Sequence, residues 1–268
     1  MKTLYVSDLD GTLLRSNEHT SEYTNTVINR LVNDGMLFSY ATARSFVTSH
    51  KVTEGLIAKF PLITYNGAMI VDNADGTFIQ QNFFNASVKE VLQDLFCHGI
   101  YPMVYSFLNG EEKFSWLPEK CTKGMMDFGR SRNDSRNHPV TEVEELSAGE
   151  IFYITCIDET EKLKPLYEKY KSDFHCVFQR DIYSGEQWLE IMPEAATKAN
   201  AALQLKKQLE CERLVVFGDG KNDTDMFEIA DESYAVSNAV QELKDIATGV
   251  IEDNNSDGVA KWLLEHYR

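Results

Sequence analysis

The sequence predicts an α/β fold: a doubly wound parallel sheet interrupted by an inserted α+β module. Short apolar, β-prone segments alternate with amphipathic helical patterns near both ends of the chain, and this alternation is typical of βαβ units. Between residues 83 and 192 the pattern changes to hairpins mixed with helices. We therefore expect one core domain made of residues 1–82 and 193–268, and a separate domain made of residues 83–192.

The first part of the core contains three predicted strands that lead into helices or a hairpin. We expect strands at Thr3–Val6, Met36–Tyr40 and Leu62–Tyr65, helices over residues 20–34 and 47–60, and a hairpin of Met69–Val71 with Thr77–Gln81. Gly35 and Pro61 end the two helices, because glycine favours a helix C-terminus and proline cannot continue a helix. Asn73–Gly76 has the composition of a hairpin turn.

The same reasoning predicts the helices and strands of the inserted module and of the second part of the core. In the module we expect helices at Ser87–His98 and Glu159–Lys171, and strands at Tyr101–Leu108, Lys113–Leu117, Ile151–Ile157, Phe174–Gln179 and Gln187–Ile191. After Pro193 the βα alternation returns. The expected helices there are Ala196–Leu209, Thr224–Ala230, Gln241–Ile246 and Gly258–His266, and the expected strands are Leu214–Phe217, Tyr234–Val236 and Val250–Ile251.

The composition excludes several classes of protein. Hydrophobic residues make up 43% and aromatic residues 11%, which is enough to bury a core and excludes a disordered chain. With 26 Lys and Arg against 42 Asp and Glu, the net charge of −16 repels nucleic acid and anionic membranes. No apolar stretch reaches the roughly 20 residues of a membrane span. Five widely spaced cysteines without a C-x-x-C pair favour a reduced, cytoplasmic protein.

Two carboxylates, Asp8 and Asp10, follow the first predicted strand. At positions i and i+2 of an extended backbone they point to the same side, and Gly11 permits a sharp turn after them. Open α/β sheets bind ligands at the carboxyl ends of their strands, and two like charges this close favour a bound cation. An ordinary acidic turn has the same composition, so the pair by itself does not decide between the two interpretations.

A second acidic loop, Gly218–Asp223, follows the predicted strand Leu214–Phe217. Asp219 and Asp223 add two carboxylates at a strand end; alternatively, Asn222 and Asp223 cap the next helix. Acidic loops at the beginning and the end of one split sheet favour a shared Mg²⁺ site, because Mg²⁺ takes hard oxygen ligands and keeps positions open for a substrate phosphate.

Two further positions supply groups suited to a phosphate. Thr42 and Ala43 lie in the loop after the second predicted strand and offer a hydroxyl and a free amide; alternatively, Thr42 caps the helix that begins near Ser45. Lys198 stands in the first turn of a predicted helix, where a cation opposes the helix dipole. This unfavourable position indicates that Lys198 has a partner elsewhere, with a solvent-facing lysine as the alternative interpretation.

In order along the chain, these segments resemble the four motifs of the haloacid dehalogenase superfamily: Asp8–Thr12, Thr42, Lys198 and Gly218–Asp223. The D-L-D-G-T-L-L opening, the A-T-x-R loop, the G-D-x-x-N-D-x-x-M run and the triplets Asn66-Gly67-Ala68, Ser237-Asn238-Ala239 and Asp257-Gly258-Val259 are similar to its Cof-type subfamily. The resemblance spans the whole chain and implies a Rossmann-like core, with a type-IIB cap domain inserted between the second and third motifs.

The resemblance implies a Mg²⁺-dependent phosphatase that works through an aspartyl-phosphate. Asp8 would be the nucleophile, and Asp10 the general acid and base. The implied metal ligands are the side chain of Asp8, the backbone carbonyl of Asp10, and Asp219, with Asp223 nearby. The implied phosphate-binding groups are Thr42, the amides of Leu9 and Ala43, Asn222 and Lys198. Ala43 stands where the subfamily usually has glycine, but its backbone amide remains available.

The expected partner is a small phosphorylated metabolite such as a sugar phosphate, and the sequence leaves the oligomeric state open. Two alternatives remain: a phosphosugar mutase or phosphotransferase of the same fold, and a non-catalytic protein that binds phosphorylated metabolites. The stretch Lys120–His138 carries five basic and two acidic residues. We interpret it as a solvated helix and loop, with a surface that attracts an anionic substrate as the alternative.

Overall fold

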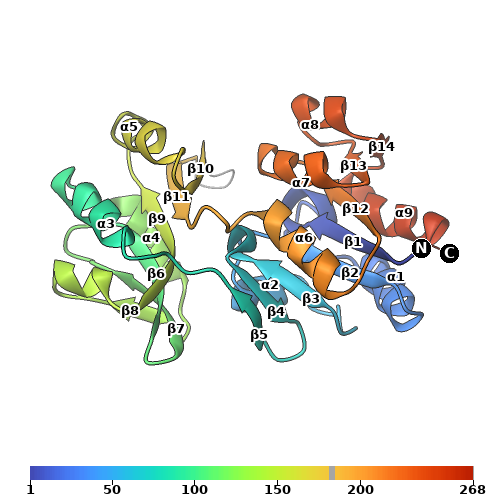
Figure 1. Cartoon of the computed structure of the whole chain (residues 1–268), viewed down its shortest axis with the longest axis horizontal. Helices are drawn as coiled ribbons and strands as arrows, with labels where there is room; N and C mark the ends of the chain where they lie inside the picture. Colours follow the sequence, from blue (N-terminus) through green and yellow to red (C-terminus); the bar gives the residue numbers. More distant parts are fainter. Residues whose placement is uncertain (181–184, 268) are drawn as a thin grey trace. The chain divides into compact units, whose positions relative to one another are not determined.

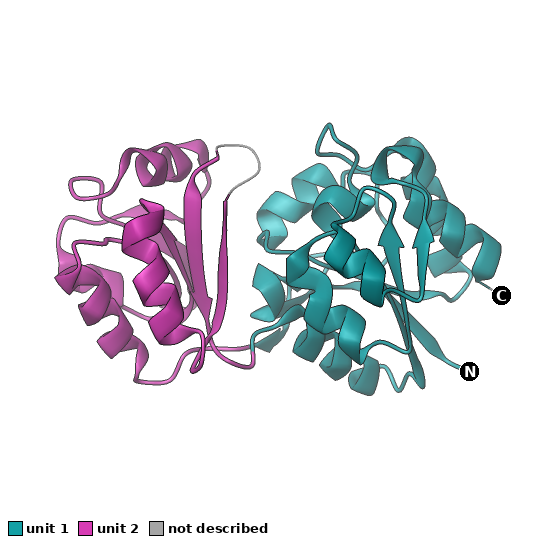
Figure 2. Ribbon diagram, turned by 90° about the horizontal axis from the view of Figure 1, so that it is seen from above, with its two compact units in different colours: residues 1–81, 196–268 teal, residues 82–195 magenta. Residues whose placement is uncertain are grey.

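The computed structural model describes residues 1–180 and 185–267, and it divides into two compact units. Unit 1 consists of Met1–Gln81 and Ala196–Arg268, and unit 2 of Asn82–Ala195 (Figure 2). The sequence placed these divisions after residue 82 and before residue 193. The predicted fold class, a parallel α/β core with an inserted α+β module, is confirmed.

Unit 1 is built on an eight-stranded sheet with the order β14-β13-β12-β1-β2-β3-β4-β5 (Figure 1). The strands are β1 (Thr3–Asp8), β2 (Leu37–Ala41), β3 (Pro61–Thr64), β4 (Met69–Asp72), β5 (Phe78–Gln81), β12 (Arg213–Gly218), β13 (Glu232–Val236) and β14 (Gly249–Ile251). The six strands from β14 to β3 are parallel, and β4 and β5 continue the sheet as an antiparallel hairpin. The strand order changes direction between β1 and β12, and ligands bind at such a switch point in open α/β sheets.

The helices of unit 1 cover both faces of this sheet (Figure 1). They are α1 (Glu22–Asn33), α2 (Phe46–Val52), α6 (Lys198–Gln208), α7 (Thr224–Ile229), α8 (Gln241–Ile246) and α9 (Gly258–His266). Helix α1 packs beside α9, and α6 packs beside α7. The crossover helices α1 and α7 lie on opposite faces, because right-handed crossovers place helices on different sides when the strands progress in opposite directions. Helices α9 and α6 each pack beside one of them.

Helix α2 is shorter than the sequence pattern predicted. The side chain of Ser45 caps the start of α2 by accepting a hydrogen bond from the Thr48 amide. The helix ends at Val52. The expected continuation to residue 60 is wrong, because Gly55 adopts a φ of +100° and Ile57 is 83% exposed. A helix cannot continue through a left-handed residue, and an apolar residue on the buried face of a helix would not be exposed.

Unit 2 contains a six-stranded sheet with the order β10-β11-β9-β6-β7-β8. Its elements are α3 (Val88–Cys97), β6 (Met103–Leu108), β7 (Glu111–Trp116), α4 (Lys123–Ser131), β8 (Asn137–Pro139), β9 (Glu150–Ile157), α5 (Thr160–Tyr170), β10 (His175–Arg180) and β11 (Gln187–Met192). Helices α3 and α5 bury an apolar cluster against the sheet that includes Leu92, Leu95, Ile154, Leu163 and Leu189. No helix in the described part of the chain is both long and apolar enough to cross a membrane.

The basic stretch Lys120–His138 is only partly the solvated segment that we expected. It forms α4 and β8, and Arg136 is just 5% exposed. The Arg136 guanidinium donates to Glu112 and to Asp134 at 2.9 Å each. The solvated interpretation is therefore wrong for Arg136, which balances two carboxylates inside unit 2.

We expect Arg136→Ala to lower the free energy of unfolding by about 2 kcal/mol, because it removes charged hydrogen bonds from two acceptors. Arg130→Ala, which removes an exposed arginine of the same stretch, is the matched control and should change stability by no more than about 0.5 kcal/mol. Urea unfolding followed by circular dichroism measures both. Equal effects of the two substitutions would contradict the structural role of Arg136.

Candidate active site

The ends of β1 and β12 bring two distant acidic loops together. The strands are parallel neighbours, with Ser7 paired to Phe217. Asp8 is the last residue of β1, and Asp219 follows the last residue of β12. Both residues thus lie at the carboxyl edge of the sheet, at the switch point in strand order.

Three carboxylates meet at this edge. Asp8, Asp219 and Asp223 each offer one carboxylate oxygen, and these oxygens lie within 4.8 Å of one another. Asp223 is fully buried, and its Oδ2 accepts hydrogen bonds from the backbone amides of Asp219 and Gly220, both at 3.1 Å. The Thr12 hydroxyl donates to Asp219 at 2.9 Å. The alternative prediction, that Asp223 only caps the next helix, is wrong because its carboxylate lies in the cluster with Asp8 and Asp219.

Lys198 supplies a positive charge to the cluster. It is the first residue of α6 and is 3% exposed, and its Nζ donates to Asp8 at 2.5 Å and to Asp223 at 2.8 Å. The helix is capped by Thr197, whose side chain accepts from the Asn200 amide. The unfavourable position of a cation in the first helical turn is thus offset by two buried ion pairs, and the solvent-facing interpretation of Lys198 is wrong.

Burial and mutual repulsion set the proton affinities in the cluster. Burial raises the pKa of Asp8 well above its usual range, the charge of Asp223 raises it further, and Lys198 only partly opposes this. Burial and Asp223 also raise the pKa of Asp219, to about 6. Burial alone would lower the pKa of Lys198, but Asp223 and Asp8 outweigh it and raise that pKa, so the side chain is an ammonium ion.

This donor set fits a divalent cation. Three carboxylates share one ammonium ion, so ionisation of all three leaves an excess of negative charge in a largely buried place. Hard carboxylate oxygens are the ligands that Mg²⁺ takes. Gly11 keeps the space beside Asp219 open, because a Cβ at this position would lie 2.4 Å from Asp219 Oδ2. Its φ of +79° also favours glycine.

Comparison with known proteins decides the family. A family model described as haloacid dehalogenase-like hydrolase matches residues 5–263. The chain belongs to this family. It is 27% identical to the 5-amino-6-(5-phospho-D-ribitylamino)uracil phosphatase YwtE of Bacillus subtilis, covering 96% of this chain and 95% of that protein. It is 26% identical to phosphatase YwpJ of the same organism, covering 98% and 99%.

Solved structures agree with this assignment. The crystal structure of TM0651 from Thermotoga maritima aligns with a TM-score of 0.79 at 26% identity, over 100% of this chain and 98% of that one. The haloacid dehalogenase subclass IIB sugar phosphatase BT4131 shares the fold, with a TM-score of 0.73 at 19% identity over 99% and 98% of the two chains. The predicted membership of the superfamily and the prediction of a hydrolytic enzyme of the phosphatase type are confirmed.

The second-motif loop of this haloacid dehalogenase-like hydrolase follows β2. Thr42 is 1% exposed, and its hydroxyl oxygen accepts a hydrogen bond from the Arg44 amide at 3.1 Å. Thr42 is not the cap of α2, because Ser45 has that role. The Thr42 amide donates a hydrogen bond to the Ile63 carbonyl, and the Thr42 carbonyl accepts one from the Asn66 amide. The Ala43 amide, in contrast, makes no hydrogen bond to a described residue.

The remaining predicted site residues differ in burial and in hydrogen bonding. Leu9 is fully buried and begins the turn Leu9–Leu13, in which Asp10 and Gly11 have non-helical backbone angles. Asn222 is exposed beside Gly220, and its side chain makes no hydrogen bond to a described residue. Asp10 does not join the carboxylate cluster of the described residues; its side chain forms an ion pair with Arg44.

Sequence reasoning missed several supporting residues. Thr12 was noted only as part of a motif, although its hydroxyl donates to Asp219. Gly11 was expected to permit a sharp turn, but not to leave space for the Asp219 carboxylate. Asn238 donates to the Gly11 carbonyl at 2.8 Å and accepts from the Asn254 amide, so it joins the loop after β13 to the first motif. The Ser237-Asn238-Ala239 triplet was a signal for this role, but its spacing did not show which atoms it contacts.

A buried turn joins the second and third motifs. Tyr65 and Asn66 both have a φ of +52°, and Gly67 has a φ of +98°. Non-glycine residues rarely adopt this conformation. A Cβ on Gly67 would lie 2.1 Å from the carbonyl oxygen of Thr197, so only glycine allows the turn to approach the start of α6. The turn thus supports the residue that precedes Lys198.

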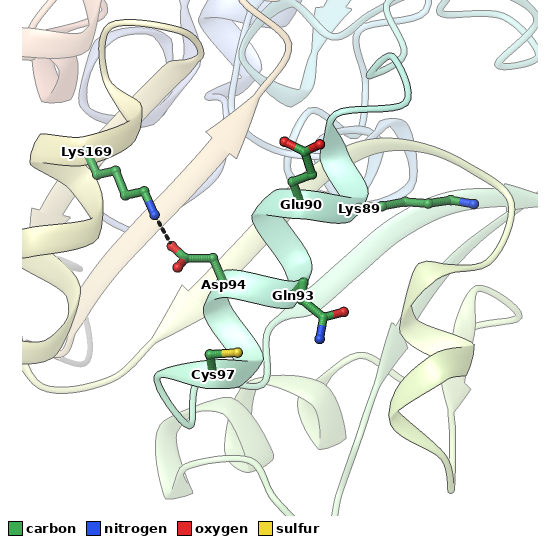
Figure 3. A pocket seen from close by; sticks show the side chains of 6 residues that line it. All are labelled: Lys89, Glu90, Gln93, Asp94, Cys97 and Lys169. Atoms are coloured by element: carbon green, nitrogen blue, oxygen red, sulfur yellow. Dashed lines mark hydrogen bonds and ion pairs between the residues drawn. The ribbon is translucent and has the colours of Figure 1, made fainter.

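Unit 2 has a pocket of its own, of about 520 Å³, on the outer side of α3 (Figure 3). Most of its lining residues come from α3, and Lys169 comes from α5. Asp94 accepts hydrogen bonds from Lys169 and from the Tyr170 hydroxyl, which hold the pKa of Asp94 below its usual range. Its acidic group is thus already satisfied by the protein, and the pocket contains no cluster of carboxylates.

We expect Asp219→Asn to stabilise the metal-free protein at pH 8. The folded-state pKa of Asp219 lies near 6 and the ordinary value is 3.8. The raised pKa favours folding below the ordinary value, and this contribution is lost as the pH rises through about 6. The neutral amide avoids that loss, so the variant should melt higher than wild type at pH 8, and the difference should vanish near pH 3.

Thermal unfolding in the presence of a chelator checks this pH dependence. Added Mg²⁺ should raise the melting temperature of the wild type by mass action and have little effect on the variant. A variant that is less stable than wild type at both pH values would show that the ionised carboxylate of Asp219 does not destabilise the folded protein.

Proposed function

We propose that this hydrolase is a Mg²⁺-dependent phosphatase of small phosphomonoesters, with sugar phosphates or similar metabolites as substrates. The observation that supports it best is the position of Asp8. This carboxylate lies at the switch point of the sheet, with Lys198 at 2.5 Å and with Asp219 and Asp223 close enough to share a cation. A carboxylate nucleophile needs this surrounding positive charge to approach a phosphoryl group.

The first step forms an aspartyl-phosphate. An Asp8 oxygen attacks phosphorus, the bond to the leaving oxygen breaks, and Asp10 gives that oxygen a proton. Asp10, now a carboxylate, takes a proton from water, whose oxygen attacks phosphorus and releases inorganic phosphate and free Asp8. Asp8, Asp219, Asp223 and the backbone carbonyl of Asp10 would hold Mg²⁺, which supplies positive charge to the phosphoryl oxygens.

The remaining groups hold the phosphoryl oxygens. The Ala43 amide and the Asn222 side chain have no partner among the described residues and can donate to an anion. The Leu9 amide and the Thr42 hydroxyl complete the expected set, and Lys198 adds positive charge. An overall charge of −16 disfavours anionic substrates, so local cations have to offset it.

The substrate class is supported by two of the similar proteins. YwtE is named as a phosphatase of a phosphorylated ribitylaminouracil, and BT4131 is named as a sugar phosphatase. Unit 2 is then the type-IIB cap. We further propose action in the cytoplasm on small metabolites, without nucleic acid or membrane partners, which agrees with five free cysteines.

We expect Asp8→Asn to lower Mg²⁺-dependent hydrolysis of p-nitrophenyl phosphate by more than about 10³-fold, because it removes the nucleophile. Asp245→Asn, which alters an exposed carboxylate on α8, is the matched control and should keep wild-type activity. Chelation should abolish the wild-type rate, and Mg²⁺ should restore it. Wild-type protein with no activity on any member of a panel of phosphorylated metabolites would contradict the proposal and favour a non-catalytic binding role.

Product analysis separates the remaining alternative. A phosphatase releases inorganic phosphate in proportion to substrate consumed, whereas a mutase or phosphotransferase produces a different sugar phosphate. Release of phosphate without an isomerised product supports hydrolysis. An isomerised product without stoichiometric phosphate would replace the proposal with the mutase alternative.

A further inference from the structure

Arg44 forms a bidentate ion pair with the carboxylate of Asp10. Nε of Arg44 donates to Oδ2 of Asp10 at 2.9 Å, and Nη2 donates to Oδ1 at 2.6 Å. Both carboxylate oxygens are thus engaged by one planar guanidinium group. Every hydrogen bond that described residues make to this carboxylate comes from Arg44.

The backbone of Arg44 is fixed on both sides of the side chain. Its amide donates to the Thr42 hydroxyl oxygen at 3.1 Å, and its carbonyl accepts from the Tyr65 amide at 3.0 Å. Thr42 and Tyr65 are both buried. The guanidinium therefore extends toward Asp10 from a backbone segment, just after the end of β2, that is held in place by hydrogen bonds.

A second carboxylate lies near the same guanidinium. Glu18 Oε2 is 3.5 Å from Arg44 Nη2, and its side chain is 45% exposed. The contact with Asp10 is shorter and bidentate, so Asp10 is the principal partner. Glu18 adds a weaker attraction that restrains the guanidinium from the side of the loop after the first motif.

Stability alone does not account for this pair. The Asp10 and Arg44 side chains are 30% and 22% exposed, and partly exposed ion pairs contribute on the order of 1 kcal/mol or less. What a bidentate pair gives is direction, because the planar fork fixes the plane of the carboxylate. In the proposed reaction, Asp10 has to reach first the leaving oxygen and then the attacking water.

We propose that Arg44 is a positioning residue that sets the orientation of Asp10 for proton transfer. This inference rests on the proposed phosphatase function. The guanidinium binds Asp10 from one side, so the proton that Asp10 gives to the leaving oxygen has to lie on the other side of the carboxyl group. Lysine cannot replace it, because a single ammonium ion bonds without fixing the carboxylate plane.

The experiment compares two substrates in Arg44→Lys. Glycerol 2-phosphate has a poor alkoxide leaving group that needs a proton, whereas the p-nitrophenolate of p-nitrophenyl phosphate leaves without one. We expect the single-turnover rate constant for glycerol release from glycerol 2-phosphate to fall about 10- to 100-fold, which is less than the roughly 10²- to 10⁴-fold of complete general acid catalysis because Asp10 itself is retained. The single-turnover rate constant for p-nitrophenolate release should fall less than about threefold, because this step needs no proton from Asp10. The later hydrolysis of the aspartyl-phosphate uses Asp10 as a base for both substrates and does not enter these two rate constants.

The ratio of the two single-turnover rate constants is the decisive quantity. A partly unfolded preparation lowers both rates equally and leaves this ratio unchanged, so a folding defect cannot imitate the expected result. Arg213→Lys is the matched control, because Arg213 forms an ion pair with Glu232 at the opposite end of β12. It should leave the ratio at its wild-type value.

A double-mutant cycle tests whether Arg44 acts through Asp10. In an Asp10→Asn background, Arg44→Lys should produce no further change in the ratio, since the group to be oriented has lost its function. An undiminished effect in that background would overturn the proposal. Equal losses in the two single-turnover rate constants, or a rise in KM alone, would also overturn it and would indicate that Arg44 binds the phosphoryl group.

The failure of the proposed function has a different signature. Wild-type protein that hydrolyses neither substrate would remove the phosphatase proposal and, with it, the role of Arg44. Wild-type protein that hydrolyses both, with an unchanged ratio in Arg44→Lys, would leave the phosphatase intact and remove only the positioning role.

Discussion

The ion pairs of Lys198 with Asp8 and Asp223 connect residues that are 190 and 25 positions apart in the chain. All three side chains are at least nine-tenths buried. A buried charge without a partner costs several kcal/mol, so β1, the start of α6 and the loop after β12 each depend on the others being in place. The sheet places these elements together, and the charges in turn define how the loops at its carboxyl edge are arranged.

Backbone conformations that few residues can adopt support this cluster. Gly11 turns the chain beside Asp219, where a side chain would collide with the carboxylate. On the other side, the left-handed run Tyr65–Gly67 holds the backbone of Arg44 and contacts the residue before Lys198. The cluster is thus formed by side chains, but its geometry is set by turns that contribute no chemistry themselves. Such local strain is typical of functional sites.

The sequence was sufficient for most of the regular elements and for the acidic loops, because both depend on local patterns, whereas the short strand β8 was not predicted. Apolar periodicity marked the strands, and the positions of Asp8, Asp219 and Lys198 relative to strand and helix ends indicated convergence. The Arg44 pair with Asp10 and the Arg136 pairs with Glu112 and Asp134 were not foreseen. Each depends on side-chain direction across neighbouring strands or loops, and no spacing rule gives that direction. Helix α2 was overestimated because Gly55 interrupts a pattern that otherwise favours a helix.

The contact between Gly67 and Thr197 lies near the place where the chain returns from its long insertion. Both residues of this contact belong to unit 1, so the backbone before Lys198 has a support that lies outside the inserted unit. A change in the length or sequence of residues 82–195 would therefore leave this contact itself in place. The inserted unit can then vary while the backbone that precedes the lysine keeps one of its supports.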